Sequence, residues 1–554
     1  MTDMLSPTET IVGEIWAELL HPEKINLEDD FFELGGDSMK ILAMLARLAD
    51  VAGVKLSPVA LMDAPTLGEF CRIIDMKKSE ALNAEVSEIV PCACNDRLPV
   101  SFIQEQIVRA ELANLYDPEK TRSHCLDLCY RIEGAIDVPT LNKALSEIVR
   151  RHEILRTSYS VKDGTIYQNV NAAPQTILRV EDLCSLPRGD RERETERILK
   201  EIATDSFSFF RDKLMIAATL ITSGTEHVLA VVVNHIAMDG LSMDILRNEL
   251  FMLYKAFSRR EPSPLANLPI QYADFALWER EHFSGDRLEA KLAWWRGLAC
   301  KSLDTALPTD HKPTTISYAG DIVPVSISPE QSRQLRQLAR KCKVTLFTVL
   351  FSAFVSLIHV FSRYRYNFFC IPVANRTRRE TQSLIGCFMN FQFVPIDLSG
   401  NPTLLEIIER FNRTLHDVYE NYVPFHFVTQ QIPPQGPVVD FQLLPAPDDG
   451  VMYPEGLRFF PFRLQPQEFA LFPIDVRLVD YSEAITGHFK YQTALYDGKT
   501  IQDMVDDYVN LLTEIAREPD IRLNDILRGE LNNSIMSGDG NDDGREGMDH
   551  PRIY

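Results

Sequence analysis

The chain has 554 residues, of which 45% are hydrophobic and 25% charged, and its formal net charge is −22. These fractions are those of an ordinary globular protein, and at roughly 100–200 residues per domain the length predicts about three or four units. The strongly negative charge argues against a nucleic-acid binder and against a protein held on membranes by basic residues.

Cysteine usage and hydropathy narrow the setting further. The cysteines are scattered, with no Cys-x-x-Cys pair and no recurring zinc-ligand spacing, so we expect reduced thiols and no metal site. The first residues, MTDMLSPTET, have neither the basic nor the apolar region of a signal peptide. The stretch VTLFTVLFSAFVSLIHVF at 344–361 approaches the length of a membrane span, but hydroxyl side chains and a histidine interrupt it. We interpret it as a buried core helix and expect a cytoplasmic protein without a membrane partner.

Residues 1–75 predict a small four-helix bundle. The first helix is expected to begin at Ser6, with Pro7 in the first helical position and Glu9 at the spacing of a capping box. The other three helices are expected to begin near Ser38, Pro58 and Thr66. Residues 76–96 lack a strong period and end in proline and small residues, which is typical of an interdomain linker.

From residue 97 to about 528 the predicted strands and helices alternate, which indicates an α/β fold. In the first half, 97–314, the strand HVLAVVVNH precedes a long helix that begins at GLSMDIL. In the second half, 315–528, the strand DIVPVSI precedes the capped helix SPEQSRQLRQLARKC. Residues 529–554 are rich in glycine and aspartate and are expected to be disordered. Two lobes with an interface between them are therefore predicted.

The stretch DDFFELGGDSMKIL (29–42) carries a serine at a predicted helix start. Two glycines break the chain, and Asp37 and Ser38 then open the helix, where free N–H groups and the helix dipole suit an anionic group on the serine oxygen. Ser38 could equally be a simple helix cap, but no nearby histidine or acid makes it a hydrolase nucleophile. Together with the helical unit around it, this stretch resembles the peptidyl carrier protein family over about residues 5–75. The resemblance implies that Ser38 carries 4′-phosphopantetheine, attached by a phosphopantetheinyl transferase, and that its thiol holds an acyl group as a thioester.

A second motif, NHIAMDG, follows the apolar run VVV at 231–233. Taken alone, Asn234, His235, Asp239 and Gly240 are as short a pattern as a packed core histidine beside an acid would produce. Further stretches occur in order: LPVSF at 98–102, RHEILRTSY at 151–159, QYADFALW at 271–278, IGCFMNFQ at 385–392 and YVPFHFV at 422–428. With the histidine motif they resemble the condensation domains of nonribosomal peptide synthetases over most of residues 97–528. The resemblance implies two chloramphenicol-acetyltransferase-like lobes arranged in a V, with a tunnel between them.

The residue types in this motif suit amide formation. An attacking α-amino group has a pKa near ~8 and must lose a proton, which a histidine with a pKa near ~6.5 can accept or position. The resemblance assigns this role to His235. Asp239 is expected to fix the loop through an arginine, with Arg376 as the first candidate partner and Arg156 as the second. The N–H of Gly240 is a candidate to face the developing oxyanion.

The motif departs from the family at its first position, where Asn234 stands in place of a histidine. An amide does not titrate, so Asn234 is expected to hold the loop by hydrogen bonds rather than to move protons. Cyclisation relatives replace the second histidine by aspartate, so the presence of His235 argues against cyclisation, and IGCFMNFQ and YVPFHFV argue against epimerisation. His152 is expected to be a packing residue.

The sequence therefore predicts a carrier–condensation didomain that transfers an acyl group from Ser38 to an acceptor amine. The alternatives are ester formation with a hydroxyl acceptor, a catalytically silent platform that recruits a partner enzyme, and an acyltransferase that uses coenzyme A thioesters. Neither the phosphate loop of an adenylation domain nor a thioesterase serine elbow is present. We therefore expect loading by an adenylation or other enzyme in trans, or a place within a larger synthetase. The acceptor is expected to be another carrier protein or a free small molecule.

Overall fold

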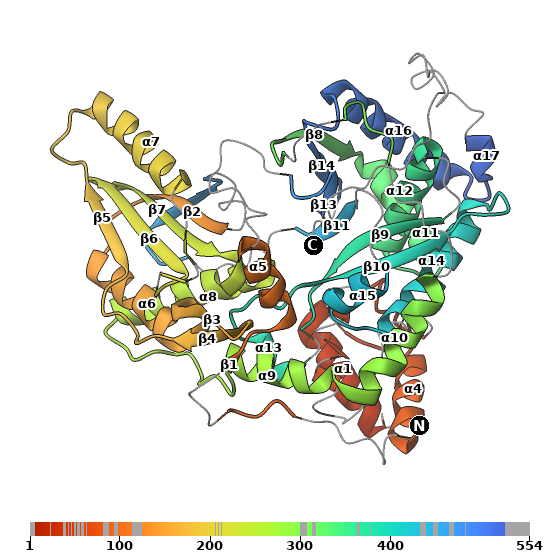
Figure 1. Cartoon of the computed structure of the whole chain (residues 1–554), viewed down its shortest axis with the longest axis horizontal. Helices are drawn as coiled ribbons and strands as arrows, with labels where there is room; N and C mark the ends of the chain where they lie inside the picture. The colour runs from red at the N-terminus through yellow and green to blue at the C-terminus, as the bar shows by residue number, and fades with distance from the viewer. Residues whose placement is uncertain are drawn as a thin grey trace.

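The computed structural model contains a small helical carrier unit and two α/β lobes (Figure 1). The residues that the structure describes are 6–22, 24–36, 40–41, 44–45, 47–48, 51, 56, 60–61, 64–80, 88–92, 98–112, 125–204, 207–208, 210–211, 213–299, 307–312, 317–362, 366–376, 378–432, 439–446, 453–464, 470–481 and 483–526.

The carrier unit is built on the helices α1 (Pro7–Leu20) and α4 (Leu67–Glu80). The predicted capping box is present: the Ser6 hydroxyl accepts from the Glu9 N–H, and the Glu9 carboxylate accepts from the Ser6 N–H. Trp16 and Phe31 are fully buried at its centre, with ring centroids 5.0 Å apart. Helix α4 continues to Glu80, five residues beyond the expected end of the carrier unit at 75. Much of the predicted second and third helices, Asp37 and Ser38 included, lies outside the described residues.

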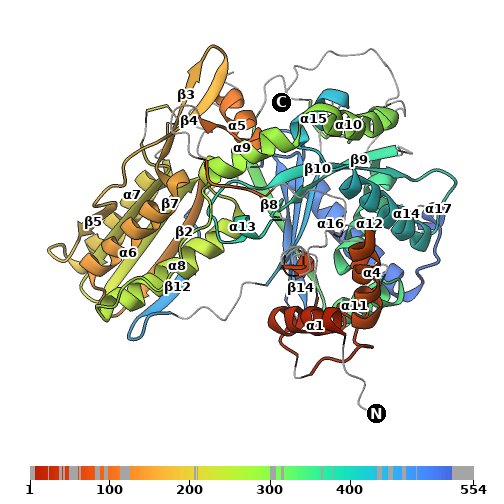
Figure 2. The same ribbon diagram turned by 90° about the horizontal axis from the view of Figure 1, so that it is seen from below.

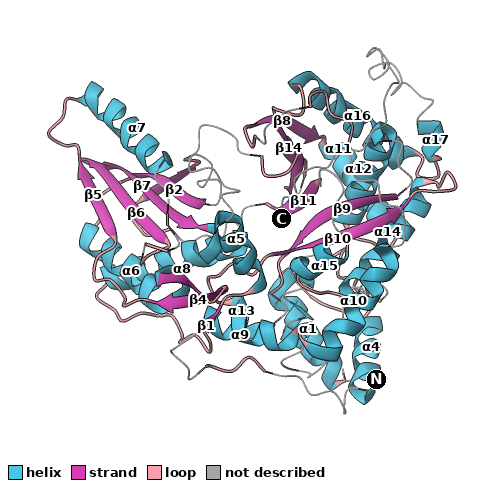
Figure 3. Ribbon diagram, in the orientation of Figure 1, coloured by secondary structure: helices cyan, strands magenta, loops and turns pink. Residues whose placement is uncertain are grey.

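The N-terminal lobe contains a five-stranded sheet in the order β12-β2-β7-β6-β5 and a smaller sheet in the order β1-β4-β3. Its strands are β1 (Leu98–Pro99), β2 (Cys125–Glu133), β3 (Thr157–Lys162), β4 (Thr165–Val170), β5 (Leu178–Asp182), β6 (Ile216–Ser223) and β7 (Glu226–Asn234). Its helices are α5 (Phe102–Leu112), α6 (Val138–Arg151), α7 (Arg188–Thr204), α8 (Gly240–Ser258), α9 (Tyr272–His282) and α10 (Gly285–Ala299), with 3-10 turns η3 (Glu153–Arg156) and η4 (His235–Ala237). Helices α6 and α8 cover one face of the large sheet and α7 covers the other (Figure 3). Strand β7 is therefore buried on both faces, as its apolar run predicted.

The C-terminal lobe contains a six-stranded sheet in the order β10-β9-β11-β13-β14-β8. Its strands are β8 (Gly320–Ile327), β9 (Tyr366–Val373), β10 (Asn390–Asp397), β11 (Asp440–Pro445), β13 (Ile474–Asp480) and β14 (Ile485–Gln492). Its helices are α11 (Pro329–Lys341), α12 (Leu346–Ser362), α13 (Arg379–Gln382), α14 (Leu404–Glu420), α15 (Phe425–Gln431), α16 (Gly498–Arg517) and α17 (Leu523–Ile526).

Helix α12 is the predicted core helix. Most of its side chains are buried, and they form the centre of the largest apolar cluster. No single helix within the described ranges is long and apolar enough to cross a membrane, and α11 and α12 meet that criterion only as a pair bent by 104°.

The two lobes are interlocked rather than divided cleanly near residue 315. Strand β12 (Arg458–Phe462) comes from the second half of the chain but pairs antiparallel with β2 in the first lobe, as the view in Figure 2 shows. Conversely, α10 precedes residue 315 but packs on α15, and the Trp295 indole donates to the Asn421 carbonyl at 3.0 Å. Two predicted α/β halves are present, but apolar burial exchanges one element in each direction between them.

Candidate functional site

The site is built where β7 ends and α8 begins. Asn234 is 1% exposed, and its side-chain oxygen accepts from the Ile236 N–H at 2.9 Å, which holds the chain in the turn that presents His235. This is the loop-holding hydrogen bond that the sequence predicted. The Nδ2 atom of Asn234 is buried and has no hydrogen-bond partner among the described residues.

Asp239 is a buried hub that receives four hydrogen bonds. Its Oδ1 accepts from the Ser242 N–H at 2.9 Å, from the Ser242 hydroxyl at 2.7 Å and from Arg376 Nη2 at 3.0 Å. Its Oδ2 accepts from the Phe388 N–H at 3.1 Å. Asp239 thus caps α8 and binds the second half of the chain with one carboxylate.

Arg376 is the partner of Asp239, as its place in the sequence predicted. It is buried, it donates through Nη1 to the carbonyls of Thr381 and Leu384, and its guanidinium lies 4.2 Å from the Phe388 ring centroid. The second candidate was wrong. Arg156 donates instead to the carbonyls of Val149, Arg150 and Asn171 and to the Glu153 carboxylate, because it follows α6 at a distance from the motif.

The segment 385–388 passes between the lobes under tight steric control. Gly386 donates its N–H to the Ser242 hydroxyl at 3.1 Å. A Cβ at this position would lie 2.2 Å from the Tyr272 ring, so only glycine fits. The Tyr272 hydroxyl donates to the Cys387 carbonyl and lies 2.9 Å from the Ser101 hydroxyl. The stretches at 98–102, 271–278 and 385–392, which are far apart in the sequence, therefore meet around one turn.

His152 is a structural residue, as expected. Its Nδ1 accepts from the Ile385 N–H at 3.2 Å, so Nε2 carries the proton and donates to Glu249 at 2.9 Å. Burial lowers the pKa of His152, which agrees with a neutral ring that links the two lobes.

His235 is partly exposed, unlike its neighbours from Asn234 to Asp239, which are buried. Its Nδ1 lies 3.8 Å from the Cys387 sulfur. Desolvation lowers the pKa of His235, the charge of Asp239 opposes that shift, and the charge of Arg477 on β13 adds to it. The imidazole is therefore neutral at neutral pH and available to accept a proton.

Gly240 is the first residue of α8 and is exposed. No atom of the described residues lies within 4 Å of a Cβ built on it, so the space beside this helix start is open to a substrate. The first N–H groups of a helix have no partner within the helix.

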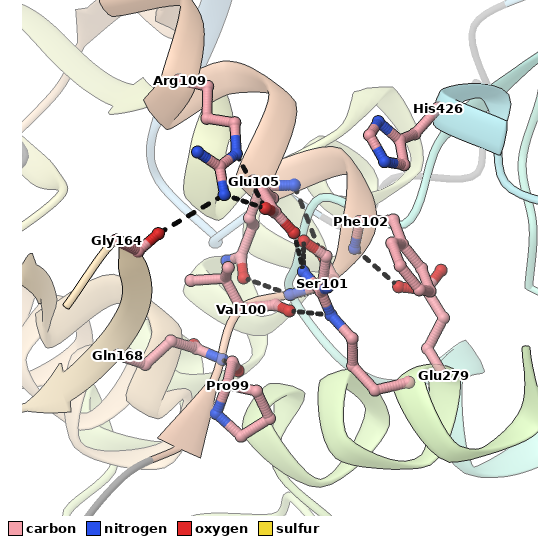
Figure 4. Close-up of polar contacts among 12 residues, drawn as sticks. Pro99, Val100, Ser101, Phe102, Glu105, Arg109, Gly164, Gln168, Glu279 and His426 are labelled. Carbon is pink, nitrogen blue, oxygen red and sulfur yellow. Dashed lines mark hydrogen bonds and ion pairs between the residues drawn. The ribbon is translucent and has the colours of Figure 1, made fainter. Parts of the chain in front are cut away.

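A buried carboxyl group lies near this turn, at the start of α5 (Figure 4). Glu279 on α9 accepts from the Phe102 N–H at 2.9 Å, and burial raises the pKa of Glu279 to about 7. The neighbouring Arg280 donates to Glu105, and its guanidinium lies 4.1 Å from the Phe102 ring centroid. This contact group ties α5 to α9 beside the interface between the lobes.

The approach to Ser38 can be followed as far as Gly36. The Gly36 N–H donates to the Phe31 carbonyl at 2.8 Å, and a Cβ on Gly36 would clash with the Phe31 ring at 2.1 Å. The Phe31 N–H donates to the Pro65 carbonyl at 2.9 Å, which anchors this loop to the start of α4. The path into residues 37–39 is thus fixed by glycine and core packing, which fits a serine presented for modification.

Comparison with known families decides the assignment. A sequence profile described as "Condensation domain" matches residues 95–529. The chain belongs to the condensation domain family. A second profile, "Phosphopantetheine attachment site", matches residues 11–74, so a carrier domain precedes the condensation domain.

Known relatives agree with this assignment. One of the proteins that make up the linear gramicidin synthase of Brevibacillus parabrevis is 32% identical over 547 residues, which cover 95% of this chain and 10% of that protein. The chain therefore spans about a tenth of this relative's length. The X-domain from teicoplanin biosynthesis has a TM-score of 0.70 at 23% identity and covers 79% of this chain and 99% of its own. The first condensation domain of the calcium-dependent antibiotic synthetase has a TM-score of 0.63 at 17% identity, with coverages of 78% and 99%. These two structures share the fold.

Several residues of the site were missed in the sequence. Ser242 lies three residues after Asp239, which is the spacing of a helix cap, and this signal could have been used. Cys387, Gly386 and Glu279 lie within or beside recognised stretches, but their contacts with residues more than 100 positions away are set by the fold.

Proposed function

We propose that this chain performs one condensation step of nonribosomal peptide synthesis, in which an acyl group held on Ser38 is transferred to an acceptor amine to form an amide. The observation that carries the proposal is His235. It is the partly exposed, neutral imidazole of a turn whose other polar residues are buried and paired with both lobes.

The 4′-phosphopantetheine attached to Ser38 supplies a thiol that holds the acyl group as a thioester. His235 accepts or positions the proton that the amine loses as it attacks. Asp239 is a positioning residue, since its oxygens are all used by Ser242, Arg376 and Phe388. The Gly240 N–H lies at a helix start beside open space, where it is suited to the developing oxyanion.

We place the carrier domain at 1–75, the linker at 76–96, the lobes at 97–314 and 315–528, and the tail at 529–554. The partners of this unit are a phosphopantetheinyl transferase, which the carrier domain requires, and neighbouring synthetase modules. We propose that an adenylation or other loading enzyme charges Ser38 and that the acceptor is a second carrier protein or a free small molecule. A hydroxyl acceptor would give an ester by the same steps.

A second function is favoured by two observations. The X-domain of teicoplanin biosynthesis shares this fold, and a structure pairs that domain with the protein OxyB. Asn234 also replaces the first histidine of the motif. A silent platform would not need a partly exposed, neutral His235, so this function ranks below condensation.

The test follows the acyl group on the intact protein by mass. The full chain is converted to its holo form, loaded with acyl groups through a promiscuous phosphopantetheinyl transferase, and offered amine and hydroxyl acceptors. We expect His235→Ala to slow product formation by roughly 10²–10⁴-fold, while His311→Ala, a surface control paired with Asp497, keeps the rate. Equal, slow release from wild type and His235→Ala, with a natural acceptor carrier among those tried, would favour the platform.

The pH profile gives a second readout. The pKa of His235 is lowered, so the neutral ring persists to more acidic pH than for an exposed histidine. We expect single-turnover kcat to fall only below about pH 6.5, as His235 becomes protonated. An acid limb above pH 7 would contradict a neutral His235.

A further inference from the structure

The C-terminal lobe has charged residues on the face of its sheet that is directed toward the N-terminal lobe. Helices α11, α12, α14 and α16 cover the other face, on the far side from the N-terminal lobe (Figures 1 and 2). Along each strand, side chains alternate between the two faces. Phe441, Val476 and Phe489 point into the helix-covered core, so their neighbours point toward the N-terminal lobe.

These neighbours form what we call the polar face: Asp440 and Gln442 on β11, Asp475 and Arg477 on β13, and His488 and Lys490 on β14. The strand register places them in two rows. Asp440 pairs with Asp475 and Asp475 with Lys490, while Gln442 pairs with Arg477 and Arg477 with His488. Six polar side chains on one patch of a central sheet are costly to bury unless each has a partner.

Most of the charges in the polar face are matched. Arg477 binds Asp475 through Nε, at 3.2 Å from each carboxylate oxygen, and through Nη2 at 3.1 Å. Lys490 lies beside Asp475 in the register. The two cations of the face therefore already have an anion between them.

Asp440 differs from this arrangement. It is 0% exposed, and its Oδ2 accepts from Gln442 Nε2 at 2.6 Å. Its Oδ1 is buried and has no hydrogen-bond partner among the described residues. The Nε2 of His488 is likewise buried and without a partner in that part of the chain. A buried carboxyl oxygen without a donor is a costly feature that a ligand can relieve.

The surroundings of Asp440 favour its protonated form. Burial and the charge of Asp475 raise the pKa of Asp440 to about 8, against the effects of Gln442 and Arg477. Cys370 on β9 also lies opposite Asp440 in the register and contributes no charge. A ligand that carries a positive charge would reverse this balance by stabilising the carboxylate.

The polar face lies close enough to the catalytic turn for Arg477 to lower the pKa of His235. A group seated on Asp440 would therefore belong to a substrate whose reacting atom is at His235.

We propose that the polar face binds a terminal ammonium group of one of the two condensation substrates, with the Asp440 carboxylate as its counter-ion. This inference rests on the proposed function. Binding moves the proton of Asp440 to solvent, and the ammonium then donates to Oδ1. The Asp475–Arg477 pair fixes the neighbouring strand and excludes a second anion. The ammonium can come from the donor acyl group or from the acceptor.

The test compares substrates that differ only in a terminal ammonium. In the donor arm, Ser38 of the full chain carries a lysyl or a norleucyl group, and both are offered the same neutral amine. In the acceptor arm, Ser38 carries an acetyl group, and lysinamide or norleucinamide is offered. We expect the lysine member to be preferred on the order of tenfold in kcat/KM in one of the arms, as for a hydrogen bond between charged groups.

Two variants and the pH dependence sharpen this test. Asp440→Asn should bring the preference to about one, whereas Asp480→Asn, which changes a carboxylate of the same strand as Asp475 that pairs with Arg336, should keep it. In wild type the preference should rise from pH 6 to pH 8, because Asp440 ionises over this range. Equal rates for both members in both arms, or a preference that survives in Asp440→Asn, would overturn the inference.

Failure of the proposed function is distinguishable from failure of this inference. If no amide forms with any substrate, condensation is refuted, and calorimetry with pentylamine against pentanol then tests the polar face without turnover. We expect pentylamine to bind with release of a proton, and this binding to be lost in Asp440→Asn. Indistinguishable titrations for the two probes would overturn the inference.

Discussion

Two buried polar clusters of this condensation domain face each other, and they differ in how completely their atoms are paired. Around Asp239, both carboxylate oxygens are occupied, by Ser242 and Arg376 on one and by Phe388 on the other. Around Asp440, one oxygen binds Gln442 and the other has no partner in the described part of the chain.

The difference separates a scaffold from a binding site. A fully paired buried network holds one geometry, because any rearrangement exposes an unpaired charge. A partly paired cluster has a free energy to gain from a ligand that supplies the missing partner. We therefore assign the Asp239 cluster to positioning His235 and the Asp440 cluster to substrate recognition.

The largest effect should come from breaking the paired cluster. Arg376→Ala leaves the buried Asp239 carboxylate without its cation and should lower the free energy of unfolding by about 3–5 kcal/mol. Chemical denaturation of the isolated chain measures this loss. Arg156→Ala is the control, since Arg156 does not touch Asp239, and an equal loss in both variants would refute the hub.

The unpaired cluster should respond in the opposite direction. The folded-state pKa of Asp440 is about 8, above the ordinary value of 3.8, so the folded state holds more protons and stability falls as pH rises between these values. Asp440→Asn removes this penalty and should raise the free energy of unfolding at pH 8 by on the order of 2 kcal/mol, with little change at pH 4. Denaturation at both pH values measures it. A destabilised Asp440→Asn at pH 8 would show that the carboxylate is already paired.

Ser242→Ala should have a smaller effect. It removes a hydroxyl that lies between Asp239 and Gly386, and the loss of such buried hydrogen bonds should lower the free energy of unfolding by about 1–3 kcal/mol. Ser258→Ala, whose hydroxyl donates to the Tyr254 carbonyl near the end of the same helix, is the matched control. Comparable losses in the two variants would remove Ser242 from the hub.

The smallest effect is expected at Asn234. Asn234→Ala frees the Ile236 N–H and should cost about 1 kcal/mol. Asn234→Asp keeps an acceptor and is the control for the hydrogen bond. Thermal unfolding measures both, and a neutral Asn234→Ala would show that the turn is held by Asp239 alone.

Much of this protein could be predicted from the sequence because the signals are local. The capping box at Ser6, the strand that ends at Asn234 and the helix that begins at Gly240 all follow from side-chain periodicity and capping chemistry. The pairing of Asp239 with Arg376 was reached through recognised stretches, and the structure bears it out.

Only the tertiary structure decided which distant side chains meet. It placed β12 in the sheet of the first lobe and α10 on the second, because the apolar faces of these elements are buried there. It gave Arg156 partners other than Asp239 and brought Cys387 to His235. It also gathered Asp440, Asp475 and Arg477 on one face, since strand order and register are set by long-range pairing that no local sequence pattern encodes.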